Sequence, residues 1–362
     1  MCGRGVRPPG LVNRPPGLLD FRSMRFLILA IAVLFPADTW WAVRESGVDS
    51  NLRGVSIVMD ESGEGDLTIW ATGSNGAVVR SSDSGKSWKR LAIPEGDSLD
   101  FRGVQAFGRE IAYVMASGEG AKSRIYKTTD GGRNWKQQYR GEDEAFFLDA
   151  LACVDQKHCF ALSDPVDGKF LLITTEDGET WKELPRDHMP AALGKEGAFA
   201  ASNSGLCVDG KDLFFGTGGP AARVFRSHDL GRTWTVVETP IAGGNASSGI
   251  FSLLCDGKTI LAMGGDYQNP AQSGRNAALS RDGGKTWELA AISPKGYRSS
   301  VAGFRAGYVA VGPTGAEVST DGSDWKHVDS TPLNAITFSG GHGRGWAAGP
   351  HGSMAQFVGR MK

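Results

Sequence analysis

The sequence has no long apolar run, no excess of charge and no ordered set of metal-binding side chains. Its longest apolar run, Phe26 to Phe35, is too short to cross a bilayer comfortably. The formal net charge is −1, which gives no electrostatic case for binding nucleic acid or an anionic membrane. Five cysteines and six histidines are present without zinc-site spacing, and no dinucleotide or flavin fingerprint occurs. We therefore expect no metal, no cofactor and no nucleic-acid partner.

What the chain has instead is abundant glycine and one repeated turn. The 51 glycines and 40% hydrophobic content suit many short strands joined by tight turns. Each copy of the repeat has the form Ser/Thr-x-Asp-x-Gly-x-Thr/Ser-Trp, most clearly from Ser280 to Trp287. The aspartate accepts local N–H groups, the glycine takes a positive φ, and the tryptophan begins a strand and is buried. We interpret the aspartates as structural. The other copies are Ser81–Trp88, Thr128–Trp135, Ser227–Trp234, Thr174–Trp181 with Glu176 in the Asp position, and Ser319–Trp325, which is one residue short.

The spacing of the turns predicts the fold. The tryptophans that end successive copies lie 47, 46, 53, 53 and 38 residues apart. Four short strands within a period of this length are typical of a β-propeller blade. The first unit shows the order, with expected strands at Leu52–Val58, Leu67–Ala71, Ala77–Arg80 and near Trp88.

Six turns nevertheless predict seven blades. After the last turn the chain has three further strand patterns, at 333–338, 345–349 and 353–357, but no fourth. Before the first unit, Thr39 to Arg44 forms a strand pattern without a blade of its own. We predict that this N-terminal strand completes blade seven, because closure removes the open edge that would otherwise promote aggregation. The predicted fold is an all-β, seven-bladed β-propeller with four-stranded blades, ring-closed by the N-terminal strand.

The residues before the propeller indicate export. We predict that residues 1–37 combine an unstructured extension with a signal peptide at about 24–37, and that residues 38–362 form the single propeller domain. Met24 is an alternative start, and a retained N-terminal anchor is the alternative to cleavage. We expect a periplasmic or extracellular protein, monomeric and without a transmembrane span once mature.

Export would permit disulfides. Cys153 and Cys159 flank a turn between two strands and suit a hairpin disulfide. Cys2 lies in the extension that precedes the propeller and is not assigned to a disulfide. For Cys207 and Cys255, at the ends of first strands in neighbouring blades, we favour two buried thiols over a bridge.

One face of the propeller collects the unusual residues. The starts of first strands and the turns between second and third strands share a face, opposite the repeated turns. Long loops on one face of a rigid scaffold are typical of a binding face. The loops expected there are Pro185–Phe199, Gly264–Asn276, Gly216–Arg223 and Ser163–Gly168.

Arginines recur at the starts of first strands. Arg53, Arg102 and Arg298 hold the same position in blades one, two and six. Such a rim of arginines suits a carboxylate or phosphate, because the planar guanidinium binds both oxygens. The alternative is that these arginines pair internally with Asp149, Asp164 or Glu196. The same position is held in blades three, four and seven by Asp149, Asn203 and Asn334.

The repeated turns are identified as Asp-box, or BNR, repeats, which mark a fold rather than a function. With the Thr39-Trp40-Trp41 strand and Leu52-Arg53-Gly54-Val55, residues 38–358 resemble the photosystem II stability/assembly factor family of propellers and their bacterial relatives. The resemblance implies an exported, non-catalytic protein of early photosystem II assembly that contacts a protein client, or a carboxylate-bearing ligand, through a basic patch. In this sequence, acidic residues on the same face reduce the positive charge of the patch. A client other than photosystem II is therefore an open alternative. The expected partner-binding residues are Arg53, Arg102, Asp149, Asp164, Glu196, Asn203, Arg223, Asp266, Tyr267, Tyr297 and Arg298.

A glycoside hydrolase of the sialidase type is the alternative function. Sialidases use three arginines, a Tyr–Glu nucleophile pair and an aspartic acid, and the same residue types occur on this face. The six-bladed ring and the Phe-Arg-Ile-Pro-like segment of sialidases are both missing from the pattern, so we favour a binding protein. The residues that would serve are Arg53, Arg102, Arg223, Arg298, Tyr267, Tyr297, Glu196, Asp164 and Asp266.

Overall fold

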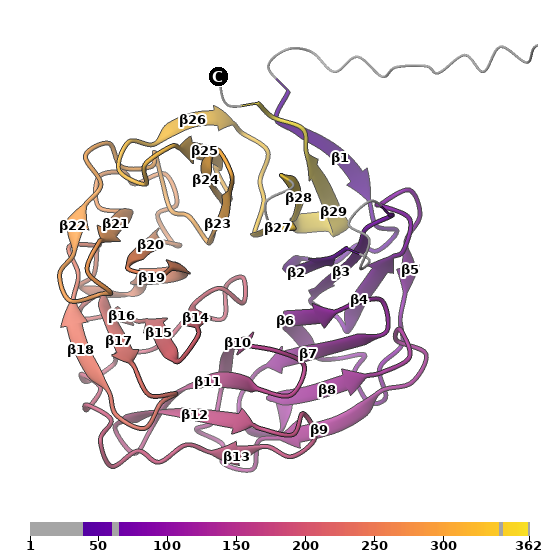
Figure 1. The fold of residues 1–362 in the computed structure, drawn as a ribbon, viewed down its shortest axis with the longest axis horizontal. Coiled ribbons are helices and arrows are strands. Elements are labelled where there is room, and N and C mark those ends of the chain that lie inside the picture. The colour runs from indigo at the N-terminus through magenta and orange to yellow at the C-terminus, as the bar shows by residue number, and fades with distance from the viewer. Residues whose placement is uncertain (1–38, 60–64, 340–342, 361–362) are drawn as a thin grey trace, which may run out of the picture. The chain divides into compact units, whose positions relative to one another are not determined.

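A computed structural model describes residues 39–59, 65–339 and 343–360, and this part of the chain forms seven antiparallel sheets. The sheets follow one another around a ring, and each has one strand nearest the centre (Figure 1). The fold is the predicted seven-bladed β-propeller. The predicted signal peptide lies outside the described residues. No helix within the described ranges is long and apolar enough to span a membrane.

Each blade is a four-stranded meander that runs from the centre outwards. The strands of blades 1 to 3 are β2 (Leu52–Val58), β3 (Thr68–Gly73), β4 (Ala77–Ser81) and β5 (Lys89–Arg90); β6 (Asp100–Phe107), β7 (Ile111–Ser117), β8 (Arg124–Thr128) and β9 (Lys136–Arg140); β10 (Leu148–Cys153), β11 (Cys159–Val166), β12 (Lys169–Thr175) and β13 (Lys182–Glu183). Two short 3₁₀ turns interrupt the strands, η1 (Gly120–Lys122) and η3 (Pro350–Gly352).

Blades 4 to 7 repeat the same order, and a two-residue strand, β16 (Gly218–Gly219), pairs with the beginning of the first strand of blade 5. Their strands are β14 (Leu206–Asp209), β15 (Asp212–Gly216), β17 (Arg223–Ser227) and β18 (Thr235–Glu238); β19 (Asn245–Asp256), β20 (Thr259–Asp266), β21 (Ala277–Ser280) and β22 (Glu288–Leu289); β23 (Ser300–Phe304), β24 (Gly307–Gly312), β25 (Gly315–Ser319) and β26 (Lys326–Asp329); β27 (Ala335–Ser339), β28 (Arg344–Ala348), β29 (Ser353–Phe357) and β1 (Trp41–Glu45).

The N-terminal strand closes the ring as predicted. β1 pairs antiparallel with β29, in a register that places Trp41 opposite Phe357 and Glu45 opposite Ser353. The Trp41 ring is buried and meets the Phe357 ring edge-on at a centroid distance of 5.6 Å. Blade 7 therefore combines strands from both ends of the chain, and the outer edge of β29 is covered.

The tryptophans after the repeated turns fill the space between blades. Trp135 of blade 2 packs edge-on against Trp70 of blade 1 at 6.1 Å, and Trp88 packs against Trp346 of blade 7 at 5.9 Å. Trp234 and Trp325 are 6% and 4% exposed within the cores that join their blades to neighbouring ones. Each turn thus supplies one large ring to the apolar layer that holds adjacent sheets together.

The repeated turns are held by their aspartates, as predicted. In the copy at 280–287, Asp282 Oδ1 accepts the N–H groups of Lys285 and Thr286, each at 3.0 Å. Its Oδ2 accepts the Thr286 hydroxyl at 2.7 Å, and the Ser280 hydroxyl donates to Oδ1 at 2.9 Å. The N–H of Thr286 is the main reason that the pKa of Asp282 lies below its usual range.

One copy of the turn differs from the prediction. Glu176 does not take the aspartate position in blade 3, because that turn is one residue shorter than expected. Asp177 takes the position, accepting the Thr175 hydroxyl at 3.0 Å and the N–H of Thr180 at 2.8 Å. Glu176 points to solvent and pairs with Lys182 at 3.1 Å.

Both cysteine pairs form disulfides. Cys153 and Cys159 are register partners across the β10–β11 hairpin, with their Cα atoms 4.0 Å apart. Cys207 on β14 is joined to Cys255 on β19, with a Cα–Cα distance of 6.3 Å. The preference for two free buried thiols is therefore wrong. The strands that carry the second pair are the inner strands of adjacent blades, and their proximity allows a bridge across the interblade space.

We predict that the closing strand is needed for a monomeric, soluble ring. Deletion of residues 39–45 exposes the edge of β29 and removes the Trp41 ring. Light scattering after size-exclusion chromatography should show concentration-dependent aggregation, and the thermal midpoint should fall. Val43→Ala is the matched control, since Val43 lies on the same strand with 47% exposure. A deletion variant as stable and monodisperse as wild type would contradict the closure.

A second prediction concerns the turns. Asp282→Ala removes an acceptor of four hydrogen bonds, so its unfolding midpoint should fall by about 2–4 °C, as for loss of a capping side chain. Asp282→Asn, which keeps one acceptor oxygen, should lose less. Differential scanning calorimetry checks the order. Loss of client binding by a normally folded Asp282→Ala protein would show that the turn is functional rather than structural.

Candidate functional site

The site is a cavity of about 540 Å³ at the end of the ring where the inner strands begin. Its walls come from six blades and from the segment that precedes blade 4. Six of the eleven predicted partner-binding residues line it: Arg53, Arg102, Asp149, Asp164, Tyr267 and Tyr297. The remaining lining residues are Phe147, Ala198, Phe199, Ala200, Ala201, Phe251, Ser299, Pro313 and Asn334.

β-Bulges position the principal side chains of the cavity. The strand register skips Arg53 in β2, Arg102 in β6 and Asp149 in β10, and each skipped residue lines the cavity. Asp164 in β11 and Phe251 in β19 are skipped in the same way. A bulge turns one residue out of the regular alternation and redirects its side chain. This shared irregularity explains why residues of separate blades converge on one space.

Arg53 presents a charged group without a partner to this cavity. The described residues form no hydrogen bond or ion pair with its guanidinium, although the side chain is half-buried. Burial, and next the charge of Arg102, lower the pKa of Arg53 from its usual value. A partly dehydrated cation beside a second cation gains most from an anion that enters the cavity.

Arg102 is already held in place by protein groups. Its Nε donates to Asp100 Oδ2 at 2.8 Å, and its Nη2 lies 2.8 Å from the same oxygen. Its Nη1 donates to the carbonyl of Ala200 at 2.9 Å, which fixes the segment before blade 4 against blade 2. Arg102 therefore contributes a positioned but neutralised charge.

Asp149 and Asp164 add two buried carboxyl groups. Asp149 is 2% exposed, and its Oδ2 has no hydrogen-bond partner among the described residues. Burial raises the pKa of Asp149 well above its usual range, and the charge of Asp164 adds to that effect. Asp164 Oδ1 accepts the N–H of Ala198 at 2.8 Å, but burial dominates and raises the pKa of Asp164 to about 6. Both groups favour their protonated forms in mildly acidic solution.

Four aromatic rings form one wall of the cavity. Phe199 stacks on Phe251 with ring centroids 3.9 Å apart, and Tyr297 meets Phe251 edge-on at 4.6 Å. Tyr267 completes the cluster at the rim, where it is 48% exposed. Burial raises the pKa of Tyr297, although the charge of Arg53 opposes this. The wall offers apolar area beside the charged groups. Sequence reasoning did not single out Phe199 or Phe251. Phe199 is the last residue of the predicted site loop 185–199, and Phe251 lies in the first strand of blade 5.

Arg298 does not join Arg53 and Arg102 at the cavity, contrary to expectation. Its side chain is fully buried in blade 6, where Nη2 donates to Glu317 Oε1 at 2.6 Å and Nε donates to Glu317 Oε2. Its Nη1 donates to the Thr314 hydroxyl at 2.8 Å. Arg298 precedes β23 and lies outside any bulge, so it turns toward the carboxylate of β25 instead of the centre.

Glu196 and Arg223, both predicted to bind a partner, bind each other. Arg223 Nε donates to Glu196 Oε1 at 2.8 Å, and Arg223 Nη2 donates to Glu196 Oε2. The Thr217 hydroxyl and the N–H of Leu193 also donate to Glu196, whose carboxylate is fully buried. This pair fastens the 185–199 loop to blade 4 and thereby supports Phe199.

Asp266 and Asn203 also make internal contacts. Asp266 accepts the N–H of Gln268 and the side-chain amide of Asn269, each at 2.9 Å. Burial opposes its ionisation, but hydrogen bonds, including one from Ser247, outweigh it and lower the pKa of Asp266 to about 2. Asn203 Oδ1 accepts the N–H of Leu151 at 2.8 Å, which ties blade 4 to blade 3. Neither residue lines the cavity.

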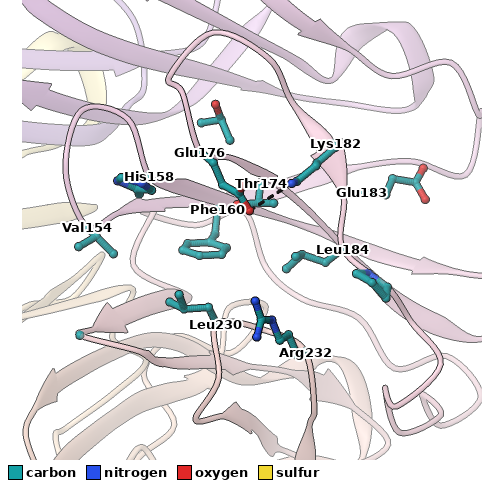
Figure 2. A pocket seen from close by; sticks show the side chains of 13 residues that line it. Val154, His158, Phe160, Thr174, Glu176, Lys182, Glu183, Leu184, Leu230 and Arg232 are labelled. Carbon is teal, nitrogen blue, oxygen red and sulfur yellow. Dashed lines mark ion pairs between the residues drawn. The ribbon is translucent and has the colours of Figure 1, made fainter.

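A second cavity of about 470 Å³ lies between blades 3 and 4 near the disulfide-bonded hairpin. Figure 2 shows its apolar residues Phe160 and Leu184 and the ion pair between Glu176 and Lys182. None of the eleven predicted site residues lines it, and it belongs to the end of the ring that carries the repeated turns. The first cavity is therefore the candidate site.

Comparisons with known proteins point to one family. The family model described as photosynthesis system II assembly factor YCF48 matches residues 39–189, which contain Arg53, Arg102, Asp149 and Asp164. A photosystem II assembly lipoprotein Ycf48 of Nostoc sp. is 31% identical over 187 residues, or 51% of this chain and 46% of the relative. The match thus spans about half the length of that relative. The protein of the same name from Trichormus variabilis is 29% identical over 293 residues, or 68% of this chain and 76% of the relative.

Solved structures agree on the fold. YCF48 from Cyanidioschyzon merolae superposes with a TM-score of 0.61 at 18% identity, over 88% of this chain and 99% of that one. The Neurospora crassa Pan2 WD40 domain reaches 0.60 at 12% identity, over 91% of this chain and 98% of that one, so the fold alone does not select the family. The sequence matches do, and they confirm the resemblance noted from the repeats: this chain is similar to the Ycf48-like photosystem II assembly factor family of propellers.

Proposed function

We propose that the protein is an exported, non-catalytic assembly factor, similar to those of photosystem II, that holds a protein client at the central cavity. The client presents a carboxylate or an acidic segment to Arg53 and an apolar side chain to the wall of Phe199, Phe251 and Tyr267. The monomeric ring supplies a rigid frame, and recognition takes place where its inner strands begin.

The observation that carries this proposal is the free guanidinium of Arg53. Other arginines of the predicted site have carboxylate partners: Asp100 for Arg102, Glu196 for Arg223 and Glu317 for Arg298. Arg53 has no such partner within the described ranges, and burial together with Arg102 lowers its pKa. An unpaired, half-buried cation costs free energy in the empty protein, and a bound carboxylate removes that cost.

Two further features support a client larger than a small molecule. Tyr267 stands half-exposed at the rim, where it can contact residues beyond the group bound inside. Its neighbours in the wall are packed ring on ring, so a bound apolar side chain would meet a preformed surface. The names of the curated relatives describe assembly proteins, which agrees with a protein client.

Export is part of the proposal. The two disulfides suit an oxidising compartment, and the predicted signal peptide would deliver the chain there. The curated relatives are named lipoproteins, which are also consistent with delivery beyond the cytoplasm.

A glycoside hydrolase remains the competing function because two carboxyl groups with raised pKa values, Asp149 and Asp164, share the cavity. The other acids weigh against it, since Glu196 is bound to Arg223 and Asp266 is stabilised as a carboxylate by several donors. We predict no turnover of sialosides or aryl glycosides. Turnover that Asp164→Asn abolishes would replace the binding proposal with the hydrolase.

Charge reversal at Arg53 tests the proposal. Arg53→Glu should reduce capture of the native client at least about tenfold, because a carboxylate would then repel the bound group. The measurement is quantitative recovery of photosystem II assembly intermediates with the tagged protein, in the native exported fraction. Capture by wild type should also weaken with added salt.

The matched control is Arg281→Glu, which reverses an exposed arginine in the repeated turn of blade 5. It should leave capture unchanged. Equal capture by the Arg53→Glu protein and wild type would move the site away from the cavity. Arg298→Glu is unsuitable, since it would bury two carboxylates together with Glu317.

A further inference from the structure

We propose that anion binding in the central cavity is coupled to proton uptake by Asp149 and Asp164, so that the site captures its ligand in mild acid and releases it as the pair ionises. This inference rests on the proposed function and adds a means of regulating the same site. It follows from where the two carboxyl groups lie and from what surrounds them.

The two aspartates occupy bulges on the adjacent strands β10 and β11, and both line the cavity. Asp149 is skipped in the register of β10 with β11, and Asp164 is skipped in the register of β11 with β12. Asp149 Oδ2 is buried without a hydrogen-bond partner in the described structure. Asp164 receives the N–H of Ala198 on Oδ1. Two carboxyl groups in one buried space resist simultaneous ionisation.

The groups around the pair do not neutralise it. From β6, Arg102 gives its guanidinium to Asp100 and to the carbonyl of Ala200. From β2, Arg53 contributes its charge to the cavity, and residues 197–201 contribute no titratable side chain. The remaining titratable side chains lining the cavity are those of Tyr267 and Tyr297. Burial raises the pKa of Asp149 well above its usual range and that of Asp164 to about 6.

Ionisation of the pair reverses the charge of the site. With both acids protonated, two arginines and Asp100 leave one net positive charge (+2 − 1 = +1). With both ionised, the same groups sum to one net negative charge (+2 − 3 = −1). The protonated form also offers carboxyl O–H donors to a bound carboxylate. The protonated form therefore binds an anion better.

The sign of the pH dependence follows from linkage. A ligand that prefers the protonated pair raises the pKa values of the pair, so binding takes up protons. Affinity should be greatest below the pKa of Asp164, about 6, and should fall as the pH rises through it. With one linked proton, the loss approaches about tenfold per pH unit above the pKa of the free protein.

N-Acetylphenylalanine is a suitable probe, since it carries one carboxylate for Arg53 and one ring for the aromatic wall. Calorimetric titration of the full chain at pH 5.5 and pH 7.5, in buffers of different ionisation enthalpy, gives affinity and proton uptake together. We expect wild type to lose about tenfold or more in affinity across this range and to take up protons on binding. N-Acetylphenylalanine amide, which lacks the charge, should show no such dependence.

Asp164→Asn is the decisive variant, because its amide oxygen can still accept the N–H of Ala198 while the group no longer titrates. It should bind the probe at pH 7.5 more tightly than wild type and with a flatter pH profile. Asp149→Asn gives a second test, and circular dichroism identifies any variant that fails to fold. Asp212→Asn, which alters an exposed carboxylate paired with His228, is the matched control and should follow wild type.

A wild-type affinity that is unchanged between pH 5.5 and 7.5 would overturn the coupling. An Asp164→Asn profile as steep as that of wild type, or no binding of the probe at pH 5.5, would do the same. A different result would reject the proposed function: client capture that does not depend on Arg53. Capture that depends on Arg53 together with a flat probe profile would reject the proton coupling alone.

Discussion

The ladder between β1 and β29 is the constraint on which the rest of the ring depends. It joins the two ends of the described chain through five register pairs, from Trp41 with Phe357 to Glu45 with Ser353. Backbone hydrogen bonds extend it on both sides, at 3.0 Å from Val358 N–H to the Trp40 carbonyl and at 3.1 Å from Ser46 N–H to the Gly352 carbonyl. Because β2 begins seven residues after β1 ends, closure also determines where Arg53 stands.

Regular strands hold the ring together, and departures from regularity build the site. A uniform inner strand alternates its side chains between the two faces of its own blade, where the interblade cores lie. The bulges at Arg53, Arg102, Asp149, Asp164 and Phe251 interrupt that alternation. The result is a central cavity whose polar groups come from rigid strands and whose aromatic wall is braced by the Glu196–Arg223 pair. Asp100, Glu196 and Glu317 pair with the other arginines of the predicted site, whereas Arg53 has no such partner among the described residues.

The sequence was informative wherever a local pattern determines the structure. β2 and β29 begin and end at the predicted residues, since alternation bounded by turn residues defines a strand without tertiary information. The six turns and their tryptophans predicted the repeated blades, and the strand patterns outside the six repeats predicted the seventh blade and its closing strand. The prediction assigned Glu176 to the aspartate position of the blade 3 turn, which Asp177 occupies. The error arose because this turn is one residue shorter than expected and has two adjacent acidic residues.

The site was harder to predict because its decisive features are tertiary. Arg298 shares the blade position of Arg53 and Arg102, but its guanidinium pairs with Glu317 on β25, two strands further along the meander than β23. One local signal does separate them. Glycine follows the arginine in blades 1 and 2, and serine follows it in blade 6. A Cβ atom at Gly103 would lie 2.6 Å from Asn203 Oδ1, so a larger residue after Arg102 would have to displace the Asn203 side chain. The pairing of Glu196 with Arg223 and of Cys207 with Cys255 likewise depends on contacts between distant segments.

Site-specific photocrosslinking tests the central claim most directly, because it reports where the client lies on the folded protein. A photoreactive p-benzoylphenylalanine at position 267 stands at the rim of the central cavity, and one at position 154 stands at the second cavity. Tyr267 and Val154 are 48% and 49% exposed, so the two probes are equally accessible. Our account predicts a client adduct from position 267 that disappears in the Arg53→Glu background, and none from position 154. An adduct from position 154 alone would place the client at the opposite end of the ring and contradict the account.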